Sequence, residues 1–324
     1  MERPVGHSTH PAGGGYALGM RRHPVPLIAL IALVLAACAP GAGASPATSA
    51  RASGSPSVIP VIVSKEQVVG SNRFLFSFLD PVTNTPVATP DRTAAVAFLG
   101  PGDTQPGKAV DGVFTWGIVG TSGVYVATVS FPAAGDWTAV FVTGTPGKPS
   151  EAIGVTFQVL AHGTTVAVGE KAPSSATPVA ADVGGDLARI ATDPTPDPKF
   201  YQLSIADALT QGRPFVLVFA TPALCQSKQC GPTLDVVKAV AKTAPGNVAF
   251  INVEPYRLTF TEGRLQPVLD TNGQLQTVDA VNQWKLTSEP WVFTVDSKGI
   301  VRGSFEGIVG VDELKTAIAV IAGS

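Results

Sequence analysis

The chain is poor in the side chains that bind soft metals. Its 324 residues include three cysteines, four histidines and two methionines. His162 is the only histidine after residue 23, and the methionines are Met1 and Met20. Thiolate and imidazole groups are the usual ligands of zinc and copper. This scarcity argues against zinc or copper handling, and we predict no metal or other cofactor.

Charged residues are also few, at 14% of the chain, and neither sign dominates. Removing residues 1–37 takes three arginines and one glutamate from 22 basic and 24 acidic side chains, which leaves a net charge of −4. Proteins that bind nucleic acid need a basic excess to meet the phosphates. Nucleic acid is therefore excluded as a predicted partner.

The sequence has no hydrophobic run long enough to span a bilayer near its start. The run Leu27–Ala37 follows Arg21 and Arg22 and covers eleven residues, which is too short for a transmembrane helix. It ends in the box Leu35-Ala-Ala-Cys38. This pattern resembles the signal of bacterial lipoproteins. The resemblance implies a signal peptide over 1–37, a lipid on Cys38, and a protein anchored to the cell membrane on its extracytoplasmic face.

Residues 38–57 are almost entirely small residues and proline. Such a composition cannot bury a core, so this segment is predicted to be a flexible tether between the lipid and the folded chain.

Residues 58–161 are predicted to form an all-β sandwich. Apolar residues alternate in short runs that are separated by turn-forming residues, and the expected strands are 73–79, 93–99, 124–131, 137–143 and 155–160. The stretch Gly123–Trp137 resembles small extracytoplasmic Ig-like domains. Two roles stay open at this point: a ligand or partner surface, and a spacer with Trp137 in its core.

Residues 162–199 are rich in Pro, Ala, Ser, Thr and Asp, which is typical of an interdomain linker. One piece of this linker has a different character. Val168-Gly-Glu-Lys-Ala-Pro173 resembles the entry hairpin of the peroxiredoxin-like and membrane-tethered branches of the thioredoxin superfamily.

From residue 200 to 324 the periodicity changes to alternating strands and helices, which predicts an α/β domain with helices packed on a central sheet. One expected helix begins at Ser204, and three more cover 234–242, 278–284 and 311–321. The expected strands are 214–219, 248–253, 291–295 and 300–305. The stretch 254–277 is longer than a usual loop and can shape a substrate surface or serve as a lid.

This order of elements resembles the thioredoxin fold. Asn282–Phe293 is similar to the helix, loop, cis-proline and strand that face the active cysteines in that family. The resemblance implies a cis peptide bond at Pro290 and a substrate-binding role for the backbone beside it.

Cys225 and Cys230 are the only cysteines after Cys38, and they lie between a predicted strand and a predicted helix. A helix N-terminus stabilises a thiolate. Five residues apart on an intact helix, their Cα atoms would be more than roughly 7 Å apart, beyond disulfide reach. A disulfide therefore requires Cys225 outside the helix, and we expect both cysteines in the loop before Pro232.

The pair departs from the thioredoxin pattern, which has two residues between its cysteines instead of four. With Pro232 aligned to the family's helix proline, Leu224 and Ser227 occupy the cysteine positions. Val218 lies about where many thioredoxins have a buried acid. Lys228 either supplies a positive charge that stabilises the thiolate or is a solvated loop lysine. Glu289 either places an acid near the thiols or is an exposed loop acid.

The sequence favours a thiol-disulfide oxidoreductase in which Cys225 attacks, Cys230 resolves, and the partner is another thiol or disulfide protein. One alternative is a binding or scaffold lipoprotein whose disulfide is structural. A second is a peroxidase, because Thr221-Pro-Ala-Leu-Cys225 resembles the peroxiredoxin motif with one extra residue. Copper-delivering thioredoxin-like proteins need a histidine in the same domain, and none follows His162.

Overall fold

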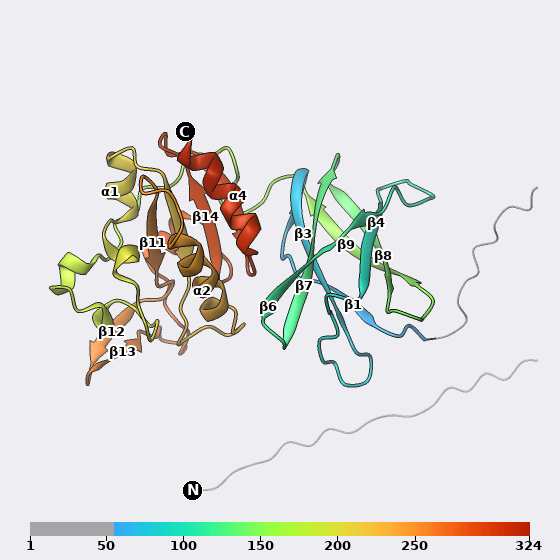
Figure 1. Ribbon diagram of the computed structural model, residues 1–324, viewed down its shortest axis with the longest axis horizontal. Coiled ribbons are helices and arrows are strands. Elements are labelled where there is room, and N and C mark those ends of the chain that lie inside the picture. The colour runs from blue at the N-terminus through green and yellow to red at the C-terminus, as the bar shows by residue number, and fades with distance from the viewer. Residues whose placement is uncertain (1–54) are drawn as a thin grey trace, which may run out of the picture. The chain divides into compact units, whose positions relative to one another are not determined.

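The computed structural model describes residues 55–324, and Ala52–Ser324 cluster as one unit (Figure 1). The predicted signal peptide 1–37, the lipid site Cys38 and nearly all of the tether lie outside the described residues. The described chain is mostly β-sheet with few helices. Among these residues, no helix combines the length and apolar character needed to cross a membrane.

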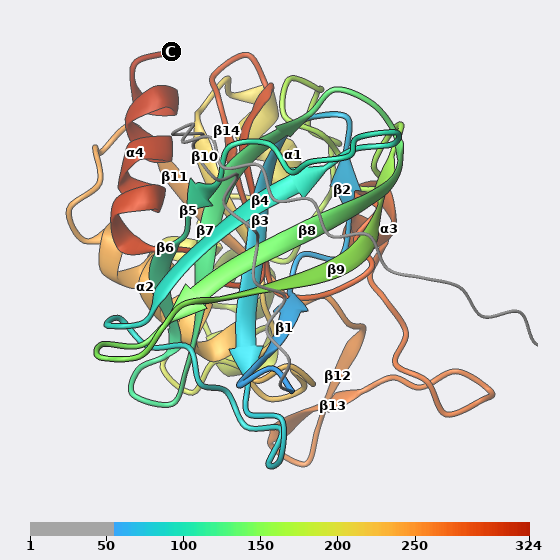
Figure 2. The same ribbon diagram turned by 90° about the vertical axis from the view of Figure 1, so that its right-hand side faces the viewer.

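The first part of the described chain, residues 58–161, contains only strands and is called the β part below. The strands are β1(Ile59–Ile62), β2(Gln67–Val68), β3(Gly70–Leu79), β4(Thr93–Leu99), β5(Val110–Asp111), β6(Val113–Ile118), β7(Ser122–Phe131), β8(Gly135–Gly144) and β9(Glu151–Leu160). They form two sheets with the orders β1-β3-β7-β6 and β2-β9-β8-β4-β5. Figure 2 looks onto β4, β8 and β9, whose strands cross those of β3 and β7 behind them.

The two sheets share one core that is rich in aromatic rings. Phe74, Phe76 and Phe78 alternate along β3 and are fully buried against Phe141 of the opposite sheet. Trp137 lies in the same core, as expected if residues 58–161 serve as a spacer. All five expected strands are confirmed, whereas the short edge strands such as β1 carry too few alternating residues to be predicted.

Residues 162–324 form the α/β part. Its elements are the 3₁₀ helices η1(Ala180–Val183), η2(Leu187–Arg189) and η3(Pro198–Tyr201), the helices α1(Ile205–Thr210), α2(Cys230–Ala241), α3(Asp279–Gln283) and α4(Val311–Ala322), and the strands β10(Phe215–Phe219), β11(Ala249–Val253), β12(Leu258–Thr261), β13(Arg264–Pro267), β14(Trp291–Val295) and β15(Val301–Glu306). The main sheet has the order β11-β10-β14-β15. In it, β10 pairs parallel with β11 and antiparallel with β14.

The expected elements of the α/β part are present, with shifts at their ends. Ser204 caps α1 by accepting a hydrogen bond from the N–H of Asp207, and the two form a capping box. Helix α2 begins four residues earlier than expected, at Cys230. The hairpin of β12 and β13 lies in the stretch 254–277, where the sequence indicated only a long loop.

Residues of the predicted linker 162–199 take part in the α/β part. Leu187 and Ala191 are buried in its core beside Val237 of α2. The segment that resembles an entry hairpin runs beside β15: the Gly169 N–H donates to the Val301 carbonyl and the Ala172 N–H to the Gly299 carbonyl. This segment therefore lies along the outer edge of β15.

Strand β3 is buried on both faces. Its second face contacts the α/β part, where Leu75 packs with Val124 and Ile308. Arg73 donates to Glu313 of α4 at 2.8 Å and to the Ile308 carbonyl at 2.6 Å, and its side chain is only 14% exposed. The β part and the α/β part are thus joined by an apolar contact and a mostly buried ion pair.

Candidate functional site

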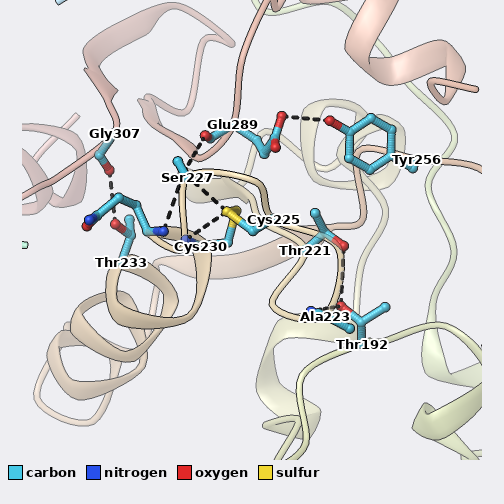
Figure 3. The surroundings of a disulfide bond; sticks show 11 residues. Thr192, Thr221, Ala223, Cys225, Ser227, Cys230, Thr233, Tyr256, Glu289 and Gly307 are labelled. Carbon is cyan, nitrogen blue, oxygen red and sulfur yellow. Dashed lines mark hydrogen bonds between the residues drawn. A yellow bond between two sulfur atoms is a disulfide. The ribbon is translucent and has the colours of Figure 1, made fainter. Parts of the chain in front are cut away.

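A disulfide joins Cys225 and Cys230 where β10 leads into α2 (Figure 3). Cys225 lies in the loop after β10, as the spacing required. Cys230 is the first residue of α2, so the expectation that both cysteines lie in the loop is wrong. Because α2 begins only at its second cysteine, the loop can turn back, and the two Cα atoms are 6.0 Å apart.

The two sulfurs differ in accessibility. Cys225 is partly buried, whereas Cys230 is fully buried in the core of the α/β part. The Cys225 sulfur accepts a hydrogen bond from the Cys230 N–H at 3.2 Å and lies 3.3 Å from the Ser227 hydroxyl (Figure 3). After reduction, the helix N-terminus and this N–H would stabilise a Cys225 thiolate. Cys225 is therefore the more exposed of the two cysteines.

Lys228 lies at the tip of the same loop. Its side chain is exposed, its φ is 60°, and its backbone N–H donates to the Cys225 carbonyl at 3.4 Å. Its ammonium makes no ion pair within the described chain. The contacts favour the interpretation of Lys228 as a solvated loop lysine.

Glu289 lies beside both sulfurs. One of its carboxylate oxygens and the two sulfur atoms all lie within 4.8 Å of one another. Its carbonyl accepts from the Ser227 hydroxyl at 3.4 Å, and its carboxylate accepts from the Tyr256 hydroxyl at 2.8 Å (Figure 3). Glu289 is partly buried, so it is not an exposed loop acid.

Tyr256 holds its proton next to this carboxylate. Burial is the largest cause that raises the pKa of Tyr256, and the hydrogen bond and charge of Glu289 raise it further. A tyrosine that stays protonated donates throughout the physiological range. It therefore fixes the Glu289 carboxylate in place beside the disulfide.

Pro290 follows Glu289 through a cis peptide bond. Gly307 connects this segment to α2: its N–H donates to the Pro290 carbonyl at 2.9 Å, and its carbonyl accepts from the Thr233 hydroxyl at 2.9 Å. These two hydrogen bonds hold the Glu289 segment in register with the helix that begins at Cys230.

A second acid, Glu254, lies at the end of β11 and was not recognised from the sequence. Its Oε1 accepts from the Thr192 N–H at 2.6 Å, and its Oε2 is buried without a partner. Burial raises the pKa of Glu254 to about 7, and hydrogen bonds from Thr192 and Thr221 offset only part of this rise. Thr192 also accepts from the Ala223 N–H at 3.3 Å, which links the acid to the cysteine loop.

The sequence held one signal for this acid, a charged residue directly after the fully buried strand β11. Val218 of β10 is fully buried among apolar side chains. Acids instead come from Glu254 on one side of the cysteine loop and Glu289 on the other.

Cys225, Cys230 and Glu289 form a group of three potential metal ligands among the described residues. Thiolates bind zinc, but sulfurs joined in a disulfide do not carry that charge. The group can therefore bind a metal only after the Cys225–Cys230 disulfide is reduced.

The peroxidase interpretation rested on the resemblance of the run Thr221–Cys225 to the peroxiredoxin motif. Thr221 is fully buried, and its hydroxyl lies 3.4 Å from that of Thr192. Among the described residues, the polar groups hydrogen-bonded to the Cys225 sulfur come from Ser227 and Cys230, and neither is an arginine. Leu224 and Ser227 lie in the loop before α2, and only Ser227 contacts the sulfur.

Searches of protein-family models, curated proteins and solved structures found no match to this chain.

Proposed function

We propose that this chain is a lipid-anchored thiol-disulfide oxidoreductase of the extracytoplasmic membrane face. In this proposal Cys38 carries the lipid, residues 58–161 are an Ig-like sandwich, and residues 200–324 are a thioredoxin-like domain. The sheet order β11-β10-β14-β15, with Cys225 in the loop after β10 and Cys230 at the start of α2, supports the fold assignment.

One observation carries the proposed chemistry. The disulfide has one accessible sulfur at a helix N-terminus and a carboxylate within 4.8 Å of both sulfurs. Exchange needs each of these: a sulfur open to attack, a stabilised thiolate, and a group that takes up or returns the proton of the second thiol. A structural cross-link needs none of them.

The reaction follows from the geometry. A partner thiolate attacks the Cys225 sulfur, a new S–S bond forms, and the Cys225–Cys230 bond breaks with its electron pair on Cys230, which takes up a proton. A second thiolate of the partner then attacks its own sulfur in the mixed disulfide and releases Cys225. The partner is oxidised by two electrons and the cysteine pair is reduced, and the reverse sequence reduces a disulfide partner.

In the reverse direction Cys230 must lose its proton before it attacks the mixed disulfide. Glu289 is placed to accept that proton, directly or through one water. Glu254 acts on the position of the cysteine loop through Thr192, which bonds both Glu254 and the Ala223 N–H.

The test is the trapping of mixed disulfides in a chain that carries Cys38→Ser. In Cys230→Ser the Cys225 thiolate attacks a partner's disulfide, and the second partner sulfur leaves as a thiolate. Because Cys230 is absent the product cannot be resolved, so stable mixed disulfides with disulfide-bonded partners are expected. Cys225→Ser is the matched control and should trap none. A reduction potential between about −120 and −270 mV supports exchange.

A structural disulfide is the second candidate, and the burial of Cys230 in the core favours it. It predicts a potential below about −300 mV and no trapped species from Cys230→Ser. That combination would refute the oxidoreductase proposal.

A further inference from the structure

A cleft of about 570 Å³ opens beside the disulfide and has one wall from each part of the chain. The β part contributes side chains of β1, β3 and β7 and their loops, including Val61, Val63 and Leu79. The α/β part contributes Ser227 and Glu289. Neither cysteine lines the cleft, but the Ser227 hydroxyl lies 3.3 Å from the Cys225 sulfur and a Glu289 carboxylate oxygen lies within 4.8 Å of it.

The β-part wall is fixed next to the redox helix. A Cβ atom on Gly117 of β6 would lie 2.8 Å from the Gln229 Oε1 and 2.5 Å from the Ile308 Cδ1, so a larger residue there would displace the ends of these two side chains. Gln229 directly precedes Cys230. With the Arg73–Glu313 ion pair, this close approach sets the distance between the wall and the disulfide.

The two walls differ in chemistry. The β-part wall is largely aliphatic, and its Val63 is 37% exposed. The opposite wall is polar, and in the described chain the backbone N–H of Glu289 donates no hydrogen bond. An aliphatic wall opposite a polar wall that includes Glu289 suits an extended peptide, whose backbone bonds one side while its side chains pack on the other.

Charge narrows the choice of partner. Glu289 and Glu306 line the cleft with Lys65, which leaves an acidic excess. An acidic side chain beside the reacting cysteine would meet these carboxylates in a partly dry cleft, and such like-charge contacts are unfavourable.

We propose that the β part is the second wall of the substrate site, and that the partner is an extended polypeptide segment whose cysteine is flanked by aliphatic residues. This inference rests on the proposed function and adds its substrate class. The β part would then select partners, in addition to holding the α/β part away from the membrane.

The test uses the full chain with Cys38→Ser and Cys230→Ser, so that Cys225 is the only thiol. Three probes carry a disulfide to thionitrobenzoate: an Ala-Val-Cys-Val-Ala peptide, an Ala-Asp-Cys-Asp-Ala peptide, and 2-mercaptoethanol. Cys225 attacks the probe sulfur, the new bond forms, and the electron pair leaves on coloured thionitrobenzoate. Its release gives the rate.

The aliphatic peptide is expected to react about tenfold faster than 2-mercaptoethanol, and the acidic peptide slower than the aliphatic one. Val63→Asp should remove this advantage and leave the rate with 2-mercaptoethanol within about twofold. Val142→Asp is the matched control, because Val142 is 36% exposed on β8, away from the cleft, and it should change neither rate.

Lys65→Glu is a second variant on an exposed side chain, and it should slow only the acidic peptide. Equal rates for the two peptides, or a Val63→Asp effect matched by Val142→Asp, would overturn the cleft proposal and leave the oxidoreductase intact. If no probe reacts with Cys225, both proposals fail.

Discussion

The β part and the α/β part bury polar groups in different ways. The buried polar residues of the β part are uncharged, whereas the α/β part buries Asp193 and Asp296. Five of the seven buried side-chain atoms without a partner in the described chain also belong to the α/β part, and Glu254 Oε2 is one of them. Unpaired polar atoms cost stability, so the α/β part carries more of this cost than the β part.

The largest effect should come from the aromatic core of the β part. Phe76→Ala removes a fully buried ring that contacts Phe74, Phe78, Tyr125 and Phe141. We expect a loss of about 3–5 kcal/mol in the free energy of unfolding, measured in urea.

Phe250→Ala in the α/β part is the matched comparison. Phe250 is 1% exposed and has one aromatic neighbour, Phe200. It should cost less than Phe76→Ala, and the reverse order would contradict the contrast between the two cores.

The next effect is a pH dependence from Glu254. Its pKa is about 7 in the folded chain, above the ordinary value of 4.5, so the folded state binds the proton more tightly. The tighter proton binding adds to the free energy of unfolding below pH 4.5. This added stability of about 3 kcal/mol is lost as the pH rises through 7.

Glu254→Gln should remove this loss, so that the variant is more stable than the parent at pH 8 and similar at pH 4.5 in urea unfolding. Glu262→Gln changes an exposed acid and serves as the control. A variant that keeps the full pH slope would show that another group causes it.

The ion pair between the two parts comes third. Arg73→Gln removes the contact with Glu313 and weakens that with the Ile308 carbonyl, with an expected cost of about 2 kcal/mol. Calorimetry should then resolve two transitions where the parent shows one. Arg264→Gln on the exposed start of β13 should leave a single transition.

A smaller effect is expected at the thiol itself. Glu289→Gln removes the negative charge beside the sulfurs, which favours the Cys225 thiolate over the thiol in the reduced chain and should raise the thiolate fraction at pH 7 by roughly tenfold. Thiolate absorbance against pH measures this. An unchanged titration would mean that Glu289 and Cys225 do not interact in the reduced chain.

The smallest effect concerns Lys228. Its left-handed φ of 60° costs about 1 kcal/mol for a residue with a Cβ atom, so Lys228→Gly should raise the unfolding free energy by at most that amount. The rate of the exchange reaction should stay the same if the ammonium does not stabilise the thiolate. A slower reaction would show that the Lys228 ammonium stabilises the thiolate.

Periodicity was enough to predict the main strands and helices. The alternating phenylalanines of β3 follow the pattern of a strand with one buried face. The continuous apolar run of β10 and the nearly continuous one of β11 follow the pattern of strands that are buried on both faces. The start of α2 was missed because Pro232 suggested a first turn, whereas the helix begins two residues before it. Helix ends depend on local hydrogen bonds that periodicity does not record.

The site was predictable only in part. Cys225, Cys230 and Pro290 could be selected from spacing and resemblance, and Glu289 from its place beside Pro290. Glu254 was missed, because its importance comes from Thr192, a residue 62 positions away in the chain. The cleft was missed for the same reason, since Val63 and Glu289 meet only through the contact between two parts of the fold.

The segment beside β15 has a further consequence, for the behaviour of many copies together. An uncovered edge strand offers unpaired N–H and carbonyl groups to other chains. The hydrogen bonds from Gly169 to Val301 and from Ala172 to Gly299 occupy that edge. The start of this edge, at Val301, is thereby closed to pairing with the sheet of a second copy.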